Sequence, residues 1–240
     1  MSDTIVTSFG GVDFTKDRAY AIMSWYLCST ISIHDKEKLA VVVGSPKGIC
    51  LNMAKEIGKD FSICRAVEAP AKPDKFCSKI HAMKGALEKS SPGDIICYLD
   101  ADVLTYSPMS ESINRFRDSN KMLLTERRLR QRDDAKKFRS WVVGLKVGKE
   151  TRDFLDRWMH HSIKTDHKFS DQIALYKTWK DFSVSSDDVV DYKEFSLSAC
   201  HFGGYKFGSK FQGTARGPFR KGHSGAMKEI RKLINRQPRF

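Results

Sequence analysis

The sequence lacks several features that would assign it to a specialised class. No stretch approaches the roughly 18 consecutive apolar residues of a membrane-spanning helix, so we expect no transmembrane segment. Residues 1–11 have neither a basic start nor a long apolar core, which argues against a secretory signal. Internal repeats and low-complexity linkers are also missing. With 40% hydrophobic and 30% charged residues, the composition is that of a globular protein and excludes collagen-like or wholly disordered chains.

The six cysteines do not form a metal or redox motif. None has the C-x-x-C spacing, which excludes a zinc ribbon and a thioredoxin-type motif. Cys64 and Cys97 lie inside apolar runs, where a free cysteine behaves as a small buried hydrophobe. We interpret all six as reduced, which indicates a cytoplasmic protein.

Acidic residues are few. Lys and Arg total 42 against 29 Asp and Glu, giving a net charge of +13. Residues 205–240 contain ten basic residues and one acidic residue, and residues 121–139 contain eight basic and three acidic residues. A field of this sign attracts polyanions such as nucleic acid, anionic lipid or phosphorylated substrates. A globular protein that simply has a high pI is the alternative.

The hydrophobic pattern of the 240 residues predicts an α/β domain with a mostly parallel central sheet flanked by helices. Short β-rich runs alternate with stretches of helical periodicity in the first half, and the run at 94–99 is continuously apolar, as in a central strand covered on both faces. The predicted strands are 4–9, 39–43, 61–67, 94–99, 122–125, 140–147 and 195–202. The predicted helices are 17–31, 49–58, 76–89, 111–119, 149–162, 171–179 and 226–235.

Two carboxylates follow the apolar run at 94–99. Asp100 and Asp102 stand one residue apart in the sequence YLDADVL. In an open α/β sheet, ligands bind outside the carboxyl ends of the strands. Neighbouring carboxylates repel each other unless a cation lies between them, and hard divalent cations prefer such oxygen ligands. This pattern favours a metal site over the alternative of an acidic turn that caps the next helix.

YLDADVL resembles the D-x-D motif of the GT-A fold glycosyltransferases, which transfer a sugar from a nucleotide-sugar donor. Two later segments resemble motifs of family 8 of these enzymes. Residues 201–207 (HFGGYKF) are similar to H-x-x-G-x-K-P, with Phe207 in place of the proline, and residues 170–172 (SDQ) are similar to (N/S)-D-Q. The motifs occur in the family's order, and the resemblance covers residues 4–207.

The resemblance implies a metal-dependent hexosyltransferase with a UDP-sugar donor and retention of configuration. Asp100, Asp102 and His201 would hold Mn²⁺, or Mg²⁺ in its place. The other implied site residues are Lys206, Gly203 and Gly204 at the donor diphosphate, and Asp171 and Gln172 as catalytic residues facing the sugar. Asp171 as the general base of an inverting enzyme stays open, as do an ordinary partly buried histidine for His201 and a surface lysine for Lys206.

The remaining donor contacts are expected on the first strand and on the helix before the D-x-D strand. Thr7, Ser8 and Phe9, with Asp13 close by, stand where the fold receives the nucleotide base. On the helix at 76–89, we favour Lys79 over Lys84 as the basic residue near the donor phosphates, with a solvated lysine as the equal alternative.

The excess positive charge predicts an anionic acceptor, because the donor carries only about two charges. Modified DNA and a lipid-linked or lipopolysaccharide-type glycan fit equally, the second with the protein peripheral at a membrane surface. We expect residues 1–207 to form the GT-A domain and residues 208–240 a basic C-terminal extension packed on it. The alternative function is a non-catalytic nucleic-acid-binding protein, for which the paired carboxylates would have no use.

Overall fold

The computed structural model describes residues 3–36, 38–72, 76–105, 108–127, 137–167, 170–182, 188–191 and 199–201. The predicted helix at 226–235, the extension at 208–240 and the site residues Gly203, Gly204 and Lys206 lie outside these residues. Within them, no helix has the length and apolar character needed to cross a bilayer.

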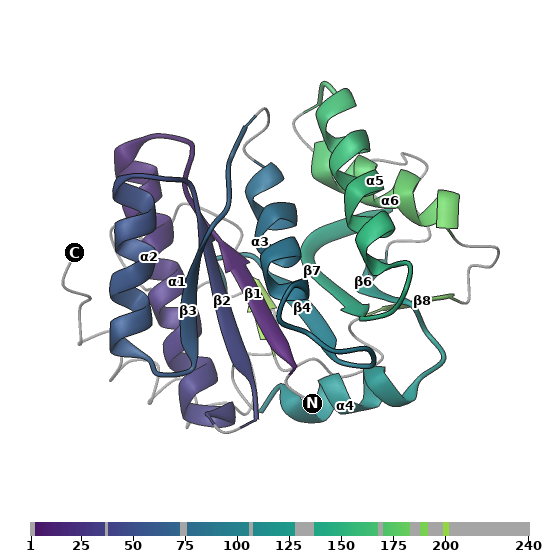
Figure 1. The fold of residues 1–240 in the computed structure, drawn as a ribbon, viewed down its shortest axis with the longest axis horizontal. Helices are drawn as coiled ribbons and strands as arrows, with labels where there is room; N and C mark the ends of the chain where they lie inside the picture. Colours follow the sequence, from purple (N-terminus) through teal and green to yellow (C-terminus); the bar gives the residue numbers. More distant parts are fainter. Residues whose placement is uncertain are drawn as a thin grey trace.

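A seven-stranded sheet forms the centre of the fold, in the order β3-β2-β1-β4-β7-β6-β8 from left to right in Figure 1. Its strands are β1 (Thr4–Ser8), β2 (Ala40–Ser45), β3 (Cys64–Glu68), β4 (Ile95–Leu99), β6 (Leu123–Arg127), β7 (Phe138–Lys146) and β8 (Val189–Asp191). All neighbouring pairs are parallel except those that β7 makes with β4 and β6. The prediction of a mostly parallel sheet is therefore confirmed.

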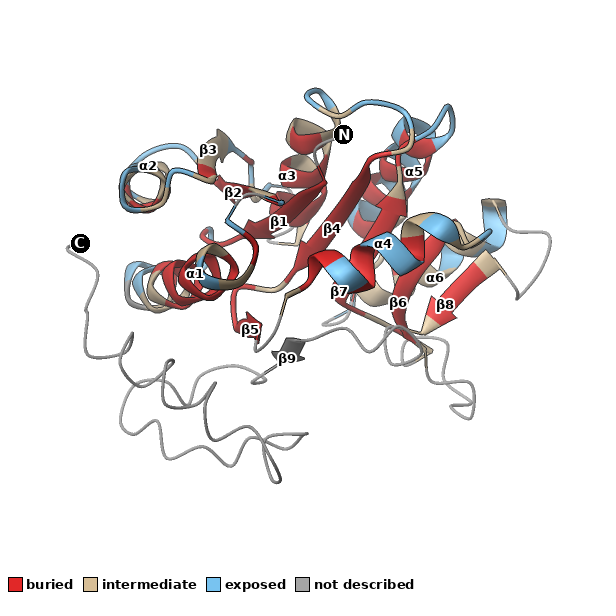
Figure 2. Ribbon diagram, turned by 90° about the horizontal axis from the view of Figure 1, so that it is seen from below, coloured by how far each residue is buried: buried red, intermediate tan, exposed pale blue. Residues whose placement is uncertain are grey.

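Helices cover both faces of the sheet. They are α1 (Phe14–Asp35), α2 (Ile49–Asp60), α3 (Cys77–Leu87), α4 (Ser110–Asp118), α5 (Thr151–Lys164) and α6 (Ser170–Phe182). Alternate residues of a strand point to opposite faces, so Ile5 packs with α1 and α2 while its neighbour Val6 packs with α3 and α5. Figure 2 shows the strands as a buried layer between α3 and α5 on one side and α1 on the other.

Close backbone approach holds α3 against the sheet. A Cβ on Gly44 of β2 would lie 2.4 Å from the Cβ of Ala82 on α3. Glycine and alanine at these facing positions let α3 pack tightly, and α3 carries Lys79 into the centre of the molecule. The helix thereby positions one of the predicted site residues beside the end of β4.

A two-stranded sheet lies beyond the end of β4. It consists of β5 (Val103–Thr105) and β9 (Ala199–His201), which pair in antiparallel fashion. In this register the backbone of His201 lies opposite Val103, the residue after Asp102. The pairing brings two segments about a hundred positions apart in sequence to the same end of the central sheet.

Candidate functional site at the carboxyl end of β4

The carboxyl end of β4 places the paired carboxylates where the sequence predicts them. Asp100 follows the last residue of β4, and its backbone N–H donates to the carbonyl of Trp141 on β7 at 2.9 Å. A tight turn follows, closed by the bond from Val103 N to Asp100 O at 3.0 Å. The Asp100 side chain is 28% exposed, whereas Asp102 is buried at 7%.

Lys79 lies at the centre of a buried polar network beside this turn. Its Nζ donates to Asp171 Oδ2 at 2.8 Å and to Asp100 Oδ1 at 3.3 Å. It also donates to the carbonyl and the hydroxyl oxygen of Ser140, each at 3.2 Å. The ammonium group therefore connects the D-x-D segment to the first turn of α6, which begins the predicted D-Q segment.

The charge of Lys79 is maintained by its neighbours. Burial alone would lower the pKa of this lysine, but the carboxylates of Asp100 and Asp171 outweigh it and raise the pKa. The Lys79 ammonium also lies 4.9 Å from the centre of the Tyr98 ring. Burial and the nearby Asp100 carboxylate raise the pKa of Tyr98, so its hydroxyl stays protonated.

Asp171 is buried and held from several sides. Its side chain is 3% exposed, and its Oδ2 accepts hydrogen bonds from Lys79 and from the Ser140 hydroxyl. Trp158 of α5 donates its indole N–H to the Asp171 carbonyl at 2.9 Å. The neighbouring Gln172 is only partly buried, and its Oε1 accepts from Arg139 Nη1 at 3.4 Å. Of the predicted pair, Gln172 is thus the more accessible.

The predicted base-binding residues lie at the end of β1. Ser8 Oγ lies 3.2 Å from the Tyr98 hydroxyl, which links β1 to the site network. Thr7 is buried and, among the described residues, its hydroxyl has no hydrogen-bond partner. Phe9 is 4% exposed and packs in the core, while Asp13 caps α1 by accepting from Lys16 N at 2.9 Å.

Sequence reasoning missed Asp17, Ser140 and Tyr98. Asp17 accepts hydrogen bonds from the backbone N–H groups of Gly11 and Val12 at 3.2 and 3.1 Å and so fixes the loop after β1. Ser140 could have been singled out because it is a polar residue within the largely apolar strand at 140–147.

The described part of the site offers carboxylates for a cation. Within it, no three His, Cys, Asp or Glu side chains converge as a complete metal site, and the His201 side chain is not among those described. Asp100 and Asp171 both pair with Lys79, and Asp102 is buried two positions after Asp100 at the end of β4. Carboxylate oxygens are the hard ligands that Mg²⁺ and Mn²⁺ prefer.

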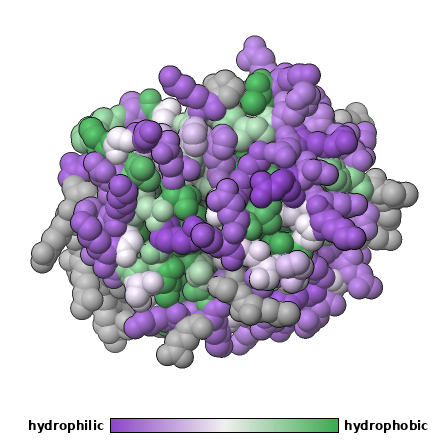
Figure 3. Space-filling model, viewed as in Figure 1, coloured by the Kyte–Doolittle hydropathy of each residue, from purple (hydrophilic) through white to green (hydrophobic). Residues whose placement is uncertain are grey.

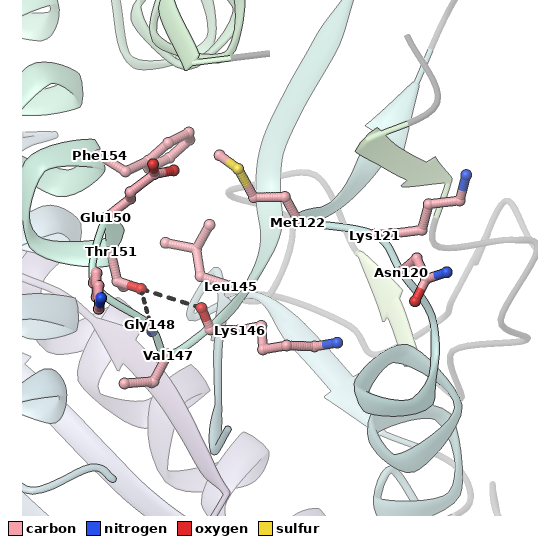
Figure 4. Close-up of a pocket in the computed structure, with 11 residues that line it drawn as sticks. Asn120, Lys121, Met122, Leu145, Lys146, Val147, Gly148, Glu150, Thr151 and Phe154 are labelled. Atoms are coloured by element: carbon pink, nitrogen blue, oxygen red, sulfur yellow. Dashed lines mark hydrogen bonds between the residues drawn. The ribbon is translucent and has the colours of Figure 1, made fainter. Parts of the chain in front are cut away.

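A separate cavity of about 430 Å³ lies at the other end of the sheet (Figure 4). Its lining includes Met122, Leu145 and Phe154, and the Thr151 hydroxyl accepts from Gly148 N there at 2.8 Å. In the β4–β7 register, Lys146 of this cavity pairs with Ile95, at the opposite end of β4 from Asp100. None of the predicted site residues lines it.

Solved structures with this arrangement of strands and helices include several glycosyltransferases. An active-site variant of LgtC matches with a TM-score of 0.55 and 13% identity, over 99% of this chain and 97% of that one. A glycosyltransferase involved in glycosylation of the major capsid of PBCV-1 matches with a TM-score of 0.52 and 13% identity, over 85% and 94%. Mouse xyloside xylosyltransferase 1 matches with a TM-score of 0.51 and 10% identity, over 79% and 84%.

No protein-family profile matches the chain, and no curated protein sequence matches it at a significant level. At 10–13% identity, the structural matches establish the architecture alone. Together with the parallel sheet, the reversed strand β7 and the carboxylates after β4, they show that the chain has the GT-A fold.

Proposed function

We propose that the protein is a metal-dependent glycosyltransferase that moves a sugar from a nucleotide-sugar, of the UDP type, to an anionic acceptor. The observation that carries the proposal is the meeting of three motif segments at one end of the sheet. Lys79 bonds both Asp100 and Asp171, and β9 brings the backbone of His201 opposite Val103. Segments separated by about 70 and 100 positions meet where α/β folds bind ligands.

Asp100, Asp102 and His201 would hold the metal, Mn²⁺ or Mg²⁺. The position of Asp100 and Asp102 directly after β4, with the backbone of His201 opposite Val103, supports this assignment. When bound, the cation would neutralise charge on the diphosphate leaving group. Lys206 would add a second positive charge, and Gly203 and Gly204 would allow close approach of the backbone to the phosphates.

At the sugar, Gln172 and Asp171 take different roles in this proposal. Gln172 is partly accessible and would contact the donor sugar, with Arg139 orienting its amide. Asp171 is buried and paired with Lys79, so it would position the network and not take a proton from the acceptor. A buried, ion-paired carboxylate is a poor general base, which supports retention over inversion.

Donor binding provides the direct test. UDP with Mn²⁺ at about 100 times its Kd should raise the melting temperature by about 5–10 °C, since ligand binding stabilises the folded state by mass action. Asp102→Asn should abolish most of this shift and lower UDP-sugar hydrolysis or transfer on the order of 10²-fold. The matched control is Asp118→Asn, which removes an exposed carboxylate at the end of α4.

A screen of UDP- and GDP-sugars would then identify the donor. If EDTA leaves the UDP shift and donor hydrolysis unchanged, the metal assignment is wrong. If no nucleotide shifts the melting temperature with Mn²⁺ present, the chain is not a nucleotide-sugar transferase, and the non-catalytic alternative gains support.

A further inference from the structure

Exposed hydrophobic residues are unevenly distributed over the described part of the chain. Figure 3 shows a face that is largely hydrophilic, with hydrophobic surface confined to smaller areas between polar side chains. Among the described residues, the large hydrophobic side chains that solvent reaches are Val12 (45%), Phe14 (61%), Ile33 (49%), Ile49 (61%) and Ile163 (49%). Three of them belong to two adjoining segments. Val12 and Phe14 lie at the start of α1, whose first residue is Phe14, and Ile49 is the first residue of α2.

Asp17 fixes these two segments against each other. Its Oδ1 accepts from Val12 N at 3.1 Å, and its Oδ2 accepts from the thiol of Cys50, next to Ile49, at 3.4 Å. Gly10 packs so closely on the second loop that a Cβ there would lie 2.8 Å from Pro46 Cδ. The exposed residues therefore sit on one fixed surface at the first turns of α1 and α2, at the upper left of Figure 1.

Two exposed basic residues belong to the same segments as this apolar surface. Lys47 is exposed two positions before Ile49, and exposed Arg18 shares a helix face with Phe14 four positions earlier. Lys16 is paired with the one exposed acid of the loop, Asp13, at 2.7 Å. We name the group of Val12, Phe14, Ile49, Arg18 and Lys47 the α1–α2 patch.

The patch lies at the same end of the strands as the candidate site. β1 pairs in parallel with both β2 and β4, so the loops after these three strands emerge on the same side. The patch follows β1 and β2, and Asp100 follows β4. A surface bound by the patch would therefore face the carboxyl end of β4.

We propose that the α1–α2 patch binds the surface of an anionic lipid bilayer. Solvent-exposed apolar side chains next to the exposed residues Arg18 and Lys47 fit an interface that is apolar inside and negatively charged at its headgroups. Nucleic acid fits the charges and the ring of Phe14 but not Val12 and Ile49, which have no ring on which a base could stack. The binding does not depend on sugar transfer, so it stands or falls separately from the proposed function.

Vesicle partitioning of the full-length protein tests the patch. Wild type should bind vesicles of 70% phosphatidylcholine and 30% phosphatidylglycerol and should bind pure phosphatidylcholine at least ten times more weakly. Phe14→Ser with Ile49→Ser should lower partitioning to the mixed vesicles at least tenfold. The matched control, Ile33→Ser with Ile163→Ser, removes two similarly exposed hydrophobic residues and should bind like wild type.

A second measurement detects insertion directly. A Phe14→Trp variant should be quenched by brominated lipids in mixed vesicles, and an Ile33→Trp variant should not. The wild-type protein measures the background, because Trp25, Trp141 and Trp158 are buried but Trp179 on α6 is only partly buried. Equal binding by the Phe14/Ile49 variant and wild type, or equal quenching of both tryptophan variants, would overturn the proposal. So would a loss of duplex DNA binding in the Phe14/Ile49 variant that leaves vesicle binding intact.

Discussion

At the scale of single residues, Lys79 decides how the site is organised. A fully charged ammonium buried between Asp100 and Asp171 is stable only while both carboxylates remain, because an isolated buried charge is costly. The same contacts hold Asp100 against α3 and prevent the D-x-D turn from moving relative to α6. The lysine therefore acts on the geometry of the carboxylates as well as on their charge.

Replacing Lys79 should reveal this coupling in stability measurements. We expect Lys79→Met to lower the free energy of unfolding by about 3–5 kcal/mol, since it leaves the buried Asp171 and the partly exposed Asp100 without their cation. Asp171→Asn should cost less, because Lys79 keeps Asp100. In the variant that combines Lys79→Met with Asp171→Asn, the loss in free energy of unfolding should be smaller than the sum of the two single losses. The difference should be about 0.5–3 kcal/mol, as measured by urea denaturation. Additive costs would contradict a network in which Lys79 and Asp171 act together.

The sequence predicted some members of this network and not others. Asp100, Asp171 and Lys79 were found because each belongs to a motif or to the helix that precedes one. Ser140 was not, because it is a serine in an apolar strand, and only the pairing of β7 with β4 brings it beside Lys79. The roles of Asp100, Asp102, His201 and the other implied site residues stay predictions until ligand binding is measured.

At the scale of helices and strands, periodicity predicted long elements well and short ones poorly. The helix expected at 17–31 runs from Phe14 to Asp35, and the strand expected at 94–99 is β4. The three-residue strands β5 and β8 were missed because too few residues repeat to show a period of two. β5 exists because β9 pairs with it, a contact about a hundred positions away that no local pattern encodes.

The helix α3 carries a histidine that should make stability depend on pH. Burial, reinforced by the Lys84 ammonium, lowers the pKa of His81 from its ordinary value of 6.5. The unfolded chain therefore binds the proton more readily, and stability should fall as the pH drops through about 6.5 and below. We expect His81→Gln to lose less stability than wild type between pH 7.5 and 5.5. The difference should be under about 1 kcal/mol, because the ring is partly solvated.

Urea denaturation at the two pH values would measure the effect. The control His160→Gln changes an exposed histidine on α5 and should follow wild type. A wild-type protein and a His81→Gln variant that lose equal stability on acidification would show that His81 does not contribute.

At the scale of the whole molecule, the positive charge is larger than the donor requires. The chain carries +13, whereas the proposed nucleotide-sugar donor carries about two negative charges, and this excess is the reason for proposing a second, anionic partner. One basic residue of the 121–139 segment is committed to the fold. Arg127 donates from Nη1 to the carbonyl of Val189 at 2.9 Å and helps to hold β8. The neighbouring Arg128, Arg130 and Arg132 lie outside the described residues and are the positions to replace in a test of this segment's charge.

Replacing Arg128, Arg130 and Arg132 with serine should weaken binding of the anionic acceptor and leave the donor untouched. Each lost contact with a polyanion removes released counterions from the binding equilibrium, so the salt dependence should flatten. For duplex DNA, the slope of log K against log salt should fall by roughly 0.9 per lost phosphate contact. Stabilisation by UDP with Mn²⁺ should equal that of wild type.

The matched control removes the same number of positive charges elsewhere, by replacing the exposed residues Lys55, Lys59 and Lys89 with serine. If the two triple variants lose affinity for duplex DNA or anionic vesicles equally, the effect is one of net charge and the 121–139 segment has no special role. If only the arginine variant loses affinity and retains donor binding, the segment belongs to the acceptor side of the molecule. Comparing the loss of affinity for duplex DNA with the loss for anionic vesicles at ~0.15 M salt then indicates which of the two polyanions the segment serves.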